Sequence, residues 1–247
     1  MMLFYRYTQK SAPAVIFISG LGDGGDSWSG VQDRIAALTT TLSYDRAGIG
    51  ASTAASGPRT CDDLVQELHR LLSKLAVEPP YILVGHSFGG LVARQFSAKF
   101  RSCTAGLVLV DGVPEYKELA YEEVLPVHLI PANRAYLENP LLNSENIDKL
   151  ASYRQIAETE LQWPGTHPMS IITRGLPDEG EGDWPSTAIL ELEQKLQRGF
   201  LRWSAAGRQR IAGGSGHYIH HDEPEIVIEE ITAMIAQCTN RPEGVEE

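Results

Sequence analysis

The stretch "YILVGHSFGG", residues 81–90, sets one serine at the change from a strand pattern to a helix pattern. The residues before Ser87 are mostly apolar and favour a buried strand, and those after it repeat apolar side chains at helical spacing. Residues 85–89 therefore form a Gly-x-Ser-x-Gly motif with a strand before it and a helix directly after it. That context predicts a nucleophile held up for attack, whereas the motif alone would indicate only a turn.

Sterics explain the two glycines of this motif. A serine on so sharp a corner has strained backbone, so Gly85 and Gly89, two positions away on either side, must lack bulky side chains. The helix that begins after Ser87 also directs its free N–H groups at the place where the oxyanion of an acyl-transfer reaction would form. A serine hydroxyl is a poor nucleophile at neutral pH, so another residue must provide a base.

Seven histidines are candidates for that base, and His217 has the best position. It stands in the glycine-rich "GGSGHYIHHDEP", between the last predicted strand and the last predicted helix, and this loop would open at the same sheet edge as the turn at Ser87. His217, His220 and Asp222 could also be metal ligands. A zinc site needs a closed ligand set of good geometry, however, and we predict no metal. His220 and His221 receive no role.

Short apolar runs alternate with amphipathic stretches, which predicts an α/β fold with a mostly parallel central sheet flanked by helices. The clearest helix begins at Thr60, because Asp63 follows it as in a capping box. The run 105–111 is too uniformly apolar to have a wet face and is predicted as a central parallel strand. The predicted strands are 3–7, 14–20, 41–45, 81–85, 105–111, 169–175 and 208–214.

Residues 112–167 interrupt the alternation. They are helical in composition, are interrupted by Pro126, Pro131, Pro140 and Pro164, and contain no convincing strand. We therefore predict a single domain over 1–247 with a helical insertion at 112–167. The aromatic side chains of this insertion could line a substrate pocket or could equally form the insertion's own core. They include Tyr116, Tyr121, Tyr136 and Trp163.

Composition limits the possible partners. The 247 residues carry a formal net charge of −11 and show no basic stripe, which argues against a nucleic-acid partner. No apolar run approaches the ~20 residues that span a bilayer, and the N-terminal charges are in the wrong order for a signal peptide. Cys61, Cys103 and Cys238 form no CxxC pair or disulfide framework, which favours a reducing compartment. We expect no membrane association and a cytoplasmic monomer or small homo-oligomer.

Five segments occur in an order that resembles the α/β-hydrolase fold superfamily. The resemblance covers nearly the whole chain outside 112–167, and it implies that this insertion is a cap over the active site. It also implies a triad in the order serine, acid, histidine and no cofactor, but it names no substrate because that fold hosts many reactions. The segments are "ISGLGDGGDSW" (18–28), "SYDRAGIGAS" (43–52), "ILVGHSFGG" (82–90), "GLVLVD" (106–111) and "GSGHYIHHDEPE" (214–225).

The same resemblance implies an oxyanion hole made of the backbone N–H groups of Leu21 and Phe88. The sequence has Ser-Gly before Leu21 where the superfamily more often has His-Gly, but a backbone donor does not depend on that difference. Asp45 and Arg46, in "YDRAGIG", are expected to brace this loop rather than to take part in the chemistry.

The acid of the triad is left open between two aspartates. Asp111 ends a central strand in "LVLVDGVP", where the backbone is rigid and burial is expected. Asp178 follows the next strand in "TRGLPDEG", which matches the superfamily's usual placement. Acidic neighbours around Asp178 indicate exposed chain, so Asp111 is favoured and Asp178 is kept as the alternative.

Ser87, His217 and Asp111 are thus predicted to form the triad of a serine hydrolase that cleaves carboxylic esters or related small acyl compounds through an acyl-enzyme. The serine at this position disfavours the haloalkane dehalogenase and epoxide hydrolase branches, which place aspartate there. Two other functions stay open. One is a ligand receptor or sensor with slow turnover, and the other is a cofactor-free perhydrolase or lyase.

Overall fold

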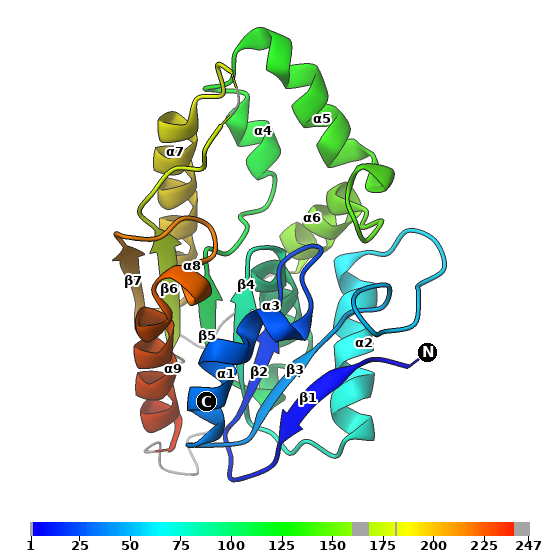
Figure 1. Cartoon of the computed structure of the whole chain (residues 1–247), viewed down its shortest axis with the longest axis vertical. Helices are drawn as coiled ribbons and strands as arrows, with labels where there is room; N and C mark the ends of the chain where they lie inside the picture. Colours follow the sequence, from blue (N-terminus) through cyan, green and yellow to red (C-terminus); the bar gives the residue numbers. More distant parts are fainter. Residues whose placement is uncertain (1, 160–167, 181, 240–247) are drawn as a thin grey trace.

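A seven-stranded sheet forms the centre of the computed structural model, which describes residues 2–159, 168–180 and 182–239 (Figure 1). The strand order is β1-β3-β2-β4-β5-β6-β7, and all neighbouring pairs are parallel except β1 with β3. The predicted α/β fold with a mostly parallel sheet is confirmed. The strands are β1 (Tyr5–Thr8), β2 (Ala14–Ile18), β3 (Thr41–Tyr44), β4 (Tyr81–His86), β5 (Thr104–Val110), β6 (Met169–Arg174) and β7 (Gly207–Ala212).

Every predicted strand is present, and its ends lie within two residues of the predicted ones. Two of the three largest differences fall at glycines, and the third is the start of β1 at Tyr5. Strand β2 stops at Ile18 and β7 stops at Ala212, because the glycine-containing loops that follow turn the chain away from the ladder.

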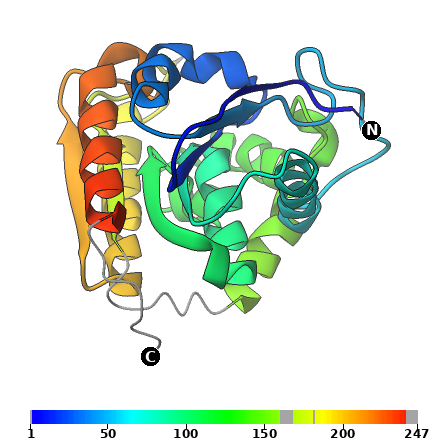
Figure 2. The ribbon, with the colours of Figure 1, turned by 90° about the horizontal axis from the view of Figure 1, so that it is seen from below.

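Side chains alternate along the inner strands between two cores, one on each face of the sheet. The covering helices are α1 (Ser29–Ala36), α2 (Cys61–Lys74), α3 (Phe88–Lys99) and α9 (Pro224–Thr239). Val15 and Phe17 of β2 pack with α1 and α9, whereas Ile16 and Ile18 pack with α2 and α3. Figure 2 shows the two helix layers from below. Burial on both faces is the reason that these strands are almost continuously apolar.

Helix α2 begins where the sequence predicts. The backbone N–H of Thr60 donates to Oδ2 of Asp63 at 2.8 Å, and the predicted capping box is present. Behind this cap, Leu64 and Leu68 are fully buried against the sheet. The capping box and the buried apolar face therefore both stabilise the helix.

Residues 112–159 lie above the carboxyl ends of the strands (Figure 1). They contain three helices and two 3-10 turns, and α6 packs against α2. Their single β-bridge joins Ile147 to Arg59. Residues 160–167, and with them Trp163, lie outside the described residues. The elements are α4 (Lys117–Tyr121), η3 (Val127–Leu129), α5 (Ile130–Glu138), η4 (Pro140–Leu142) and α6 (Lys149–Glu158).

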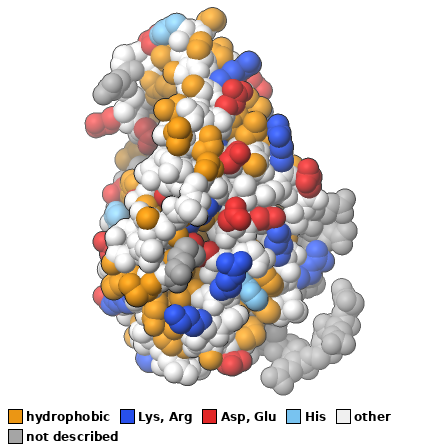
Figure 3. Space-filling model, turned by 90° about the vertical axis from the view of Figure 1, so that its right-hand side faces the viewer, with side chains coloured by type: hydrophobic (Ala, Val, Ile, Leu, Met, Phe, Trp, Pro, Cys, Tyr) orange, Lys and Arg blue, Asp and Glu red, His pale blue; other side chains and the backbone are white. Residues whose placement is uncertain are grey.

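The remaining elements flank the sheet. They are η1 (Gly25–Trp28), η2 (Arg101–Cys103), α7 (Ser186–Arg198), η5 (Gly199–Trp203) and α8 (Ile219–Asp222). In the described part of the chain, no helix combines the length and the apolar character needed to cross a membrane. On the face drawn in Figure 3, acidic and basic side chains are interspersed.

Candidate active site

Ser87 occupies the turn between β4 and α3, with φ 52° and ψ −122°. Only close packing holds a serine in this conformation. A Cβ atom on Gly85 would lie 2.5 Å from the carbonyl oxygen of Gly89, and one on Gly89 would lie 2.6 Å from the carbonyl oxygen of Ser19. Both glycines are therefore needed to bring β4, α3 and the end of β2 together around the serine.

His217 and Asp111 meet beside this turn, although 106 positions separate them in the sequence. Nδ1 of His217 lies 2.6 Å from Oδ2 of Asp111. Asp111 directly follows β5 with φ 44°, a left-handed conformation that aspartate adopts more readily than most residues. Its other oxygen, Oδ1, accepts a hydrogen bond of 2.8 Å from Nε2 of Gln197. The buried carboxylate is thus hydrogen-bonded at both oxygens.

The charge of Asp111 determines which nitrogen of His217 carries a proton. Burial opposes ionisation, but the hydrogen bond and the charge of His217, together with Arg174 at 3.7 Å, hold the pKa of Asp111 below its usual value. An ionised carboxylate only accepts hydrogen bonds, so Nδ1 of His217 must donate. Nε2 of the neutral ring is then the proton acceptor.

Asp178 has different partners. Its carboxylate pairs with Nη1 of Arg174, and its side chain is 53% exposed. Nη2 of Arg174 donates to Glu193 at 2.6 Å. Of the two candidate aspartates, the structure brings Asp111 and not Asp178 to His217.

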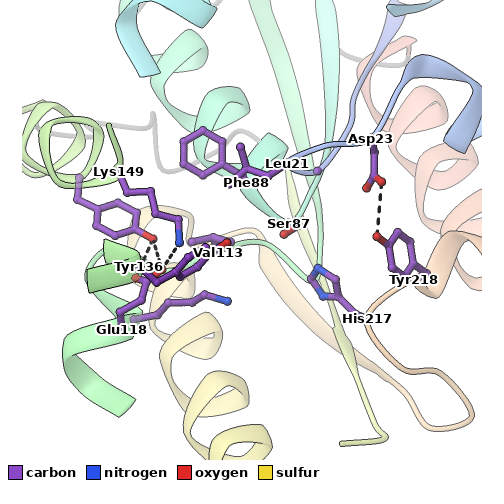
Figure 4. A pocket seen from close by; sticks show the side chains of 13 residues that line it. Leu21, Asp23, Ser87, Phe88, Val113, Glu118, Tyr136, Lys149, His217 and Tyr218 are labelled. Atoms are coloured by element: carbon purple, nitrogen blue, oxygen red, sulfur yellow. Dashed lines mark hydrogen bonds and ion pairs between the residues drawn. The ribbon is translucent and has the colours of Figure 1, made fainter. Parts of the chain in front are cut away.

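Leu21 and Phe88 border the same cavity as Ser87 and His217 (Figure 4). Phe88 is the first residue of α3, and N–H groups at that end of a helix have no carbonyl partner within the helix. Leu21 follows β2, whose carboxyl end lies beside β4 in the parallel sheet. The two backbone segments therefore converge on the serine from neighbouring strands.

A buried charge network braces the loop after β2. Nη1 of Arg46 donates to the carbonyl oxygen of Ser19 at 2.6 Å, and Nη2 donates to that of Gly20. Glu145, which lies between α5 and α6, pairs with Arg46 at 2.6 Å and accepts a hydrogen bond from the N–H of Gly22 at 2.9 Å. The bracing role expected for Arg46 is confirmed, and residues 112–159 contribute to it.

Asp45 acts on the same loop from the end of β3. Its Oδ1 accepts a hydrogen bond of 2.8 Å from the N–H of Gly25, and its Oδ2 accepts one of 3.1 Å from the N–H of Ala51. Neither Asp45 nor Arg46 borders the cavity beside Ser87, so both have the supporting position that the sequence predicts.

Two adjoining cavities open beside Ser87, with volumes of about 210 Å³ and about 270 Å³. They share four bordering residues, which are Lys117, Glu118, Tyr136 and His217. The first reaches the serine, and the second runs toward α7. Both include residues of α4 and α5, so the helices above the sheet shape the space in which a substrate would lie.

The aromatic side chains that could line a substrate pocket do not all border the cavities. Tyr136 borders both cavities and Tyr121 borders the second. Tyr116 borders neither of them and packs edge-on against Tyr153, with ring centroids 5.4 Å apart. Trp163 is not among the described residues.

His86 supports the loop of His217. Its Nε2 lies 3.0 Å from the backbone carbonyl oxygen of His217. Burial lowers the pKa of His86 well below its usual value, so the ring is neutral and its proton must lie on Nε2 to make this hydrogen bond. His86 therefore fixes the position of the loop that carries His217.

His220 and His221 hold the other side of this loop. Nε2 of His220 lies 2.8 Å from the hydroxyl of Ser27, and its ring stacks on Trp28 at 4.4 Å. Nε2 of His221 lies 2.9 Å from the carbonyl oxygen of Ser27, while Asp222 accepts a hydrogen bond within its own loop. Within the described ranges, no group of three or more His, Cys, Asp or Glu side chains could hold a metal ion.

Sequence reasoning missed Gln197 and Glu193, the polar residues on the buried side of α7. A signal was available. Ile189, Glu193 and Gln197 recur every four residues, so two polar side chains fall on the face that an amphipathic helix buries, where each needs a partner. The charged residues of α4 and α6 at the cavities were missed too, and their local spacing carries no comparable signal.

The fold and this arrangement of residues define a hydrolase of the α/β type. The chain belongs to the Alpha/beta hydrolase family, whose sequence model matches residues 15–230. The predicted superfamily is thereby confirmed.

Two curated relatives match most of the chain. The uncharacterized protein YqjL of Bacillus subtilis is 27% identical over 221 residues, which are 88% of this chain and 81% of that protein. A protein of Gibberella zeae, named as a member of the AB hydrolase superfamily, is 24% identical over 284 residues, covering 92% of this chain and 88% of that protein.

Solved structures share the fold at low sequence identity. A thermophilic esterase from Thermogutta terrifontis has a TM-score of 0.68 and 17% identity, and the match covers 96% of this chain and 93% of that one. Est816, described as an N-acyl homoserine lactone degrading enzyme, has a TM-score of 0.61 and 12% identity, with 94% and 96% covered.

Proposed function

We propose that the chain is a serine hydrolase that cleaves carboxylic esters or related acyl compounds through an acyl-enzyme on Ser87. The observation that carries the proposal is the 2.6 Å contact between His217 and Asp111 beside a serine on a strand-to-helix turn. The esterase and the lactone-degrading enzyme of the same fold are similar proteins whose names agree with ester chemistry.

In the proposed reaction, Nε2 of His217 takes the proton of the Ser87 hydroxyl as its oxygen attacks the acyl carbon. Asp111 keeps the proton of the resting ring on Nδ1 and stabilises the imidazolium that forms. The N–H groups of Leu21 and Phe88 donate to the oxyanion of the tetrahedral intermediate. His217 then protonates the leaving group, and water attacks the acyl-enzyme by the same route.

Fluorophosphonate labelling and turnover of short p-nitrophenyl esters test the nucleophile. We expect label on the peptide that contains Ser87, and we expect Ser87→Ala to lose both labelling and turnover. Because the oxyanion donors are backbone groups, a weak residual rate over water would be compatible with the mechanism. Labelling of a different residue, or unchanged turnover in Ser87→Ala, would overturn the proposal.

A matched pair of variants tests the acid. Asp111→Asn should lower kcat by about 10⁴-fold, because the amide no longer holds the required tautomer of His217. Asp178→Asn removes an exposed partner of Arg174 and should stay within about twofold of the wild type. Steady-state kinetics of both variants on one ester decides between them. Near-normal turnover in Asp111→Asn with loss in Asp178→Asn would reverse the assignment.

Pre-steady-state kinetics with substrate in excess separates this proposal from the slow sensor that the sequence also allows. A hydrolase releases its first acyl group and continues at a steady rate, whereas a receptor of this fold would stop or slow after one equivalent of product.

A further inference from the structure

The cavity beside the nucleophile has two chemically different sides (Figure 4). Asp23 and Tyr218 lie on the side of His217, and Glu118 and Lys149 lie on the opposite side. The general acid must reach the oxygen of the leaving group, so the alcohol part of an ester belongs on the side of His217. The acyl part then extends toward α4 and α6.

Charged side chains border the acyl side together with Val113, Tyr136 and Tyr153. Nζ of Lys149 donates to Oε1 of Glu118 at 2.6 Å, and the hydroxyl of Tyr153 donates to Oε2 at 3.0 Å. Lys149 also lies over the ring of Tyr136, 3.4 Å from its centroid. Both oxygens of Glu118 are therefore occupied by donors of the protein itself.

Glu193 is occupied in the same way. Its carboxylate accepts hydrogen bonds from Lys117 at 3.1 Å, from Arg174 at 2.6 Å and from the hydroxyl of Tyr121. These groups leave the carboxylates of the acyl side with no need for a further donor. The charged groups on this side that keep unused donors are the ammonium groups of Lys117 and Lys149.

Lys117 is the most exposed of the four charged side chains Lys117, Glu118, Lys149 and Glu193. An ammonium group has three N–H donors, and Lys117 directs two of them to Glu193 and to the hydroxyl of Tyr121, which leaves a third for a ligand. Its side chain is 20% exposed, compared with 2% for Glu118, 4% for Lys149 and 7% for Glu193. It also borders both cavities. Burial works against its charge, but the Glu193 carboxylate holds the pKa of Lys117 well above its usual value.

We infer that the acyl side binds a chain that ends in a carboxylate, which pairs with the ammonium group of Lys117, so that the substrates are monoesters of short dicarboxylic acids. A plain alkyl chain would strip water from this ammonium group and give it no acceptor in return, which is unfavourable. A terminal carboxylate replaces the lost water with a charge-assisted hydrogen bond. The cavity of about 210 Å³ limits the chain to a short one.

The reaction itself rests on the proposed function and uses only water as a second reactant. The ester oxygen leaves as an alcohol with a proton from His217, and the acyl carbon forms a bond to the oxygen of Ser87. Water then gives its oxygen to the acyl carbon and a proton back to Ser87 by way of His217. The products are the alcohol and the free dicarboxylate.

Calorimetry on the Ser87→Ala variant tests the inference without turnover. The probes are monomethyl glutarate and methyl 5-oxohexanoate, which have nearly the same shape but differ in the charge at the far end of the acyl chain. We expect the anionic ester to bind at least about tenfold more tightly, as one hydrogen bond between charged groups allows. Equal binding, or tighter binding of the neutral ester, would overturn the inference.

Second substitutions in the same background assign the effect to one side chain. Lys117→Met should remove the preference and Lys117→Arg should keep it, while Lys195→Met, on the exposed side of α7, should leave it unchanged. A preference that persists in a folded Lys117→Met variant contradicts the role of Lys117. If the Lys117→Met variant does not fold, the binding of the two esters to the Ser87→Ala protein and to its Lys117→Arg variant still tests whether the anionic ester is preferred.

Hydrolysis by the wild-type protein keeps the two proposals apart. Ser87-dependent hydrolysis of the neutral ester without a binding preference would uphold the serine hydrolase and overturn the substrate class. A Lys117-dependent preference for the anionic ester, with no hydrolysis of any ester, would uphold the anion site and overturn the hydrolase.

Discussion

One serine and two glycines at the turn 85–89 depend on one another. Ser87 has a backbone conformation that the chain would not adopt alone, and Gly85 and Gly89 remove the side chains that would prevent it. Glycine loses more backbone entropy on folding than other residues do. The two glycines are nevertheless required here, because the main chains of β4, α3 and β2 leave no room for a side chain.

Replacing Gly89 tests this dependence. A methyl group there would overlap the carbonyl oxygen of Ile18 and lie 2.6 Å from that of Ser19, so Gly89→Ala should lower the free energy of unfolding by about 3 kcal/mol. Gly30→Ala is the matched control, since nothing lies within 4 Å of its added Cβ on the exposed side of α1. The control should gain about 0.5–1 kcal/mol from helix propensity. Urea denaturation of both variants is the measurement, and equal stabilities would contradict the steric account.

Helix α7 links the helices above the sheet to the proposed triad. Glu193 receives Lys117 from α4 and Arg174 from β6, and Gln197, one turn further along the helix, holds Asp111. One face of α7 therefore contacts both Lys117, which borders the cavities, and Asp111, which lies beside His217. A displacement of α7 would therefore disturb the contacts of Lys117 and of Asp111 together.

The charge of Glu193 makes this connection sensitive to pH. Burial opposes its ionisation, but Lys117 and Arg174 lower the pKa of Glu193 to about 2. The folded-state pKa therefore lies below the unfolded-state value of about 4.3, so the ionised group stabilises the fold above about pH 4.3. That contribution is lost as the pH falls from about 4.3 toward 2.

Glu193→Gln measures this contribution. At pH 7 the free energy of unfolding of the variant should be about 3 kcal/mol below that of the wild type. The difference should shrink as the pH falls from about 4.3 toward 3, because Glu193 of the unfolded wild-type chain gains a proton in that range. Urea denaturation at both pH values gives the comparison. Glu191→Gln, exposed on the same helix, should show no such trend. A difference that stays constant from pH 7 to pH 3 would contradict the assignment.

On the scale of the whole molecule, the residues of the candidate site all lie at one edge of the sheet. Ser87 follows β4, Asp111 follows β5, and His217 lies in the loop after β7. In a parallel sheet the carboxyl ends of these strands lie at the same edge, so loops far apart in sequence meet there. The two cores that pack the helices on the faces of the sheet therefore also keep these loops close together.

Cys61 reports on the integrity of this core. It is fully buried at the start of α2, and burial raises the pKa of its thiol far above the usual value. Iodoacetamide at pH 8 should therefore leave Cys61 unmodified in the native protein and alkylate it only in urea. Cys103 and Cys238, which are half-buried, serve as internal controls. Peptide mass spectrometry checks the outcome, and native alkylation of Cys61 would indicate local opening of α2.

The amino-acid sequence by itself determined the α/β fold, the seven strands, and the candidate nucleophile and base. These features are local, because alternation, capping and the glycines around Ser87 act between near neighbours. The position of His217 at the cavity of Ser87 was also expected from the sequence, because a loop after the last parallel strand opens at a known edge of the sheet.

Only the tertiary structure brought Asp111 rather than Asp178 to His217. Both aspartates follow parallel strands, and the acidic neighbours of Asp178 favour Asp111 without fixing which side chain turns inward. The pairing of Lys117 with Glu193, and of Arg46 with Glu145, likewise joins residues 76 and 99 positions apart. Such contacts are decided by how helices and loops pack on the sheet, which is a property of the whole fold.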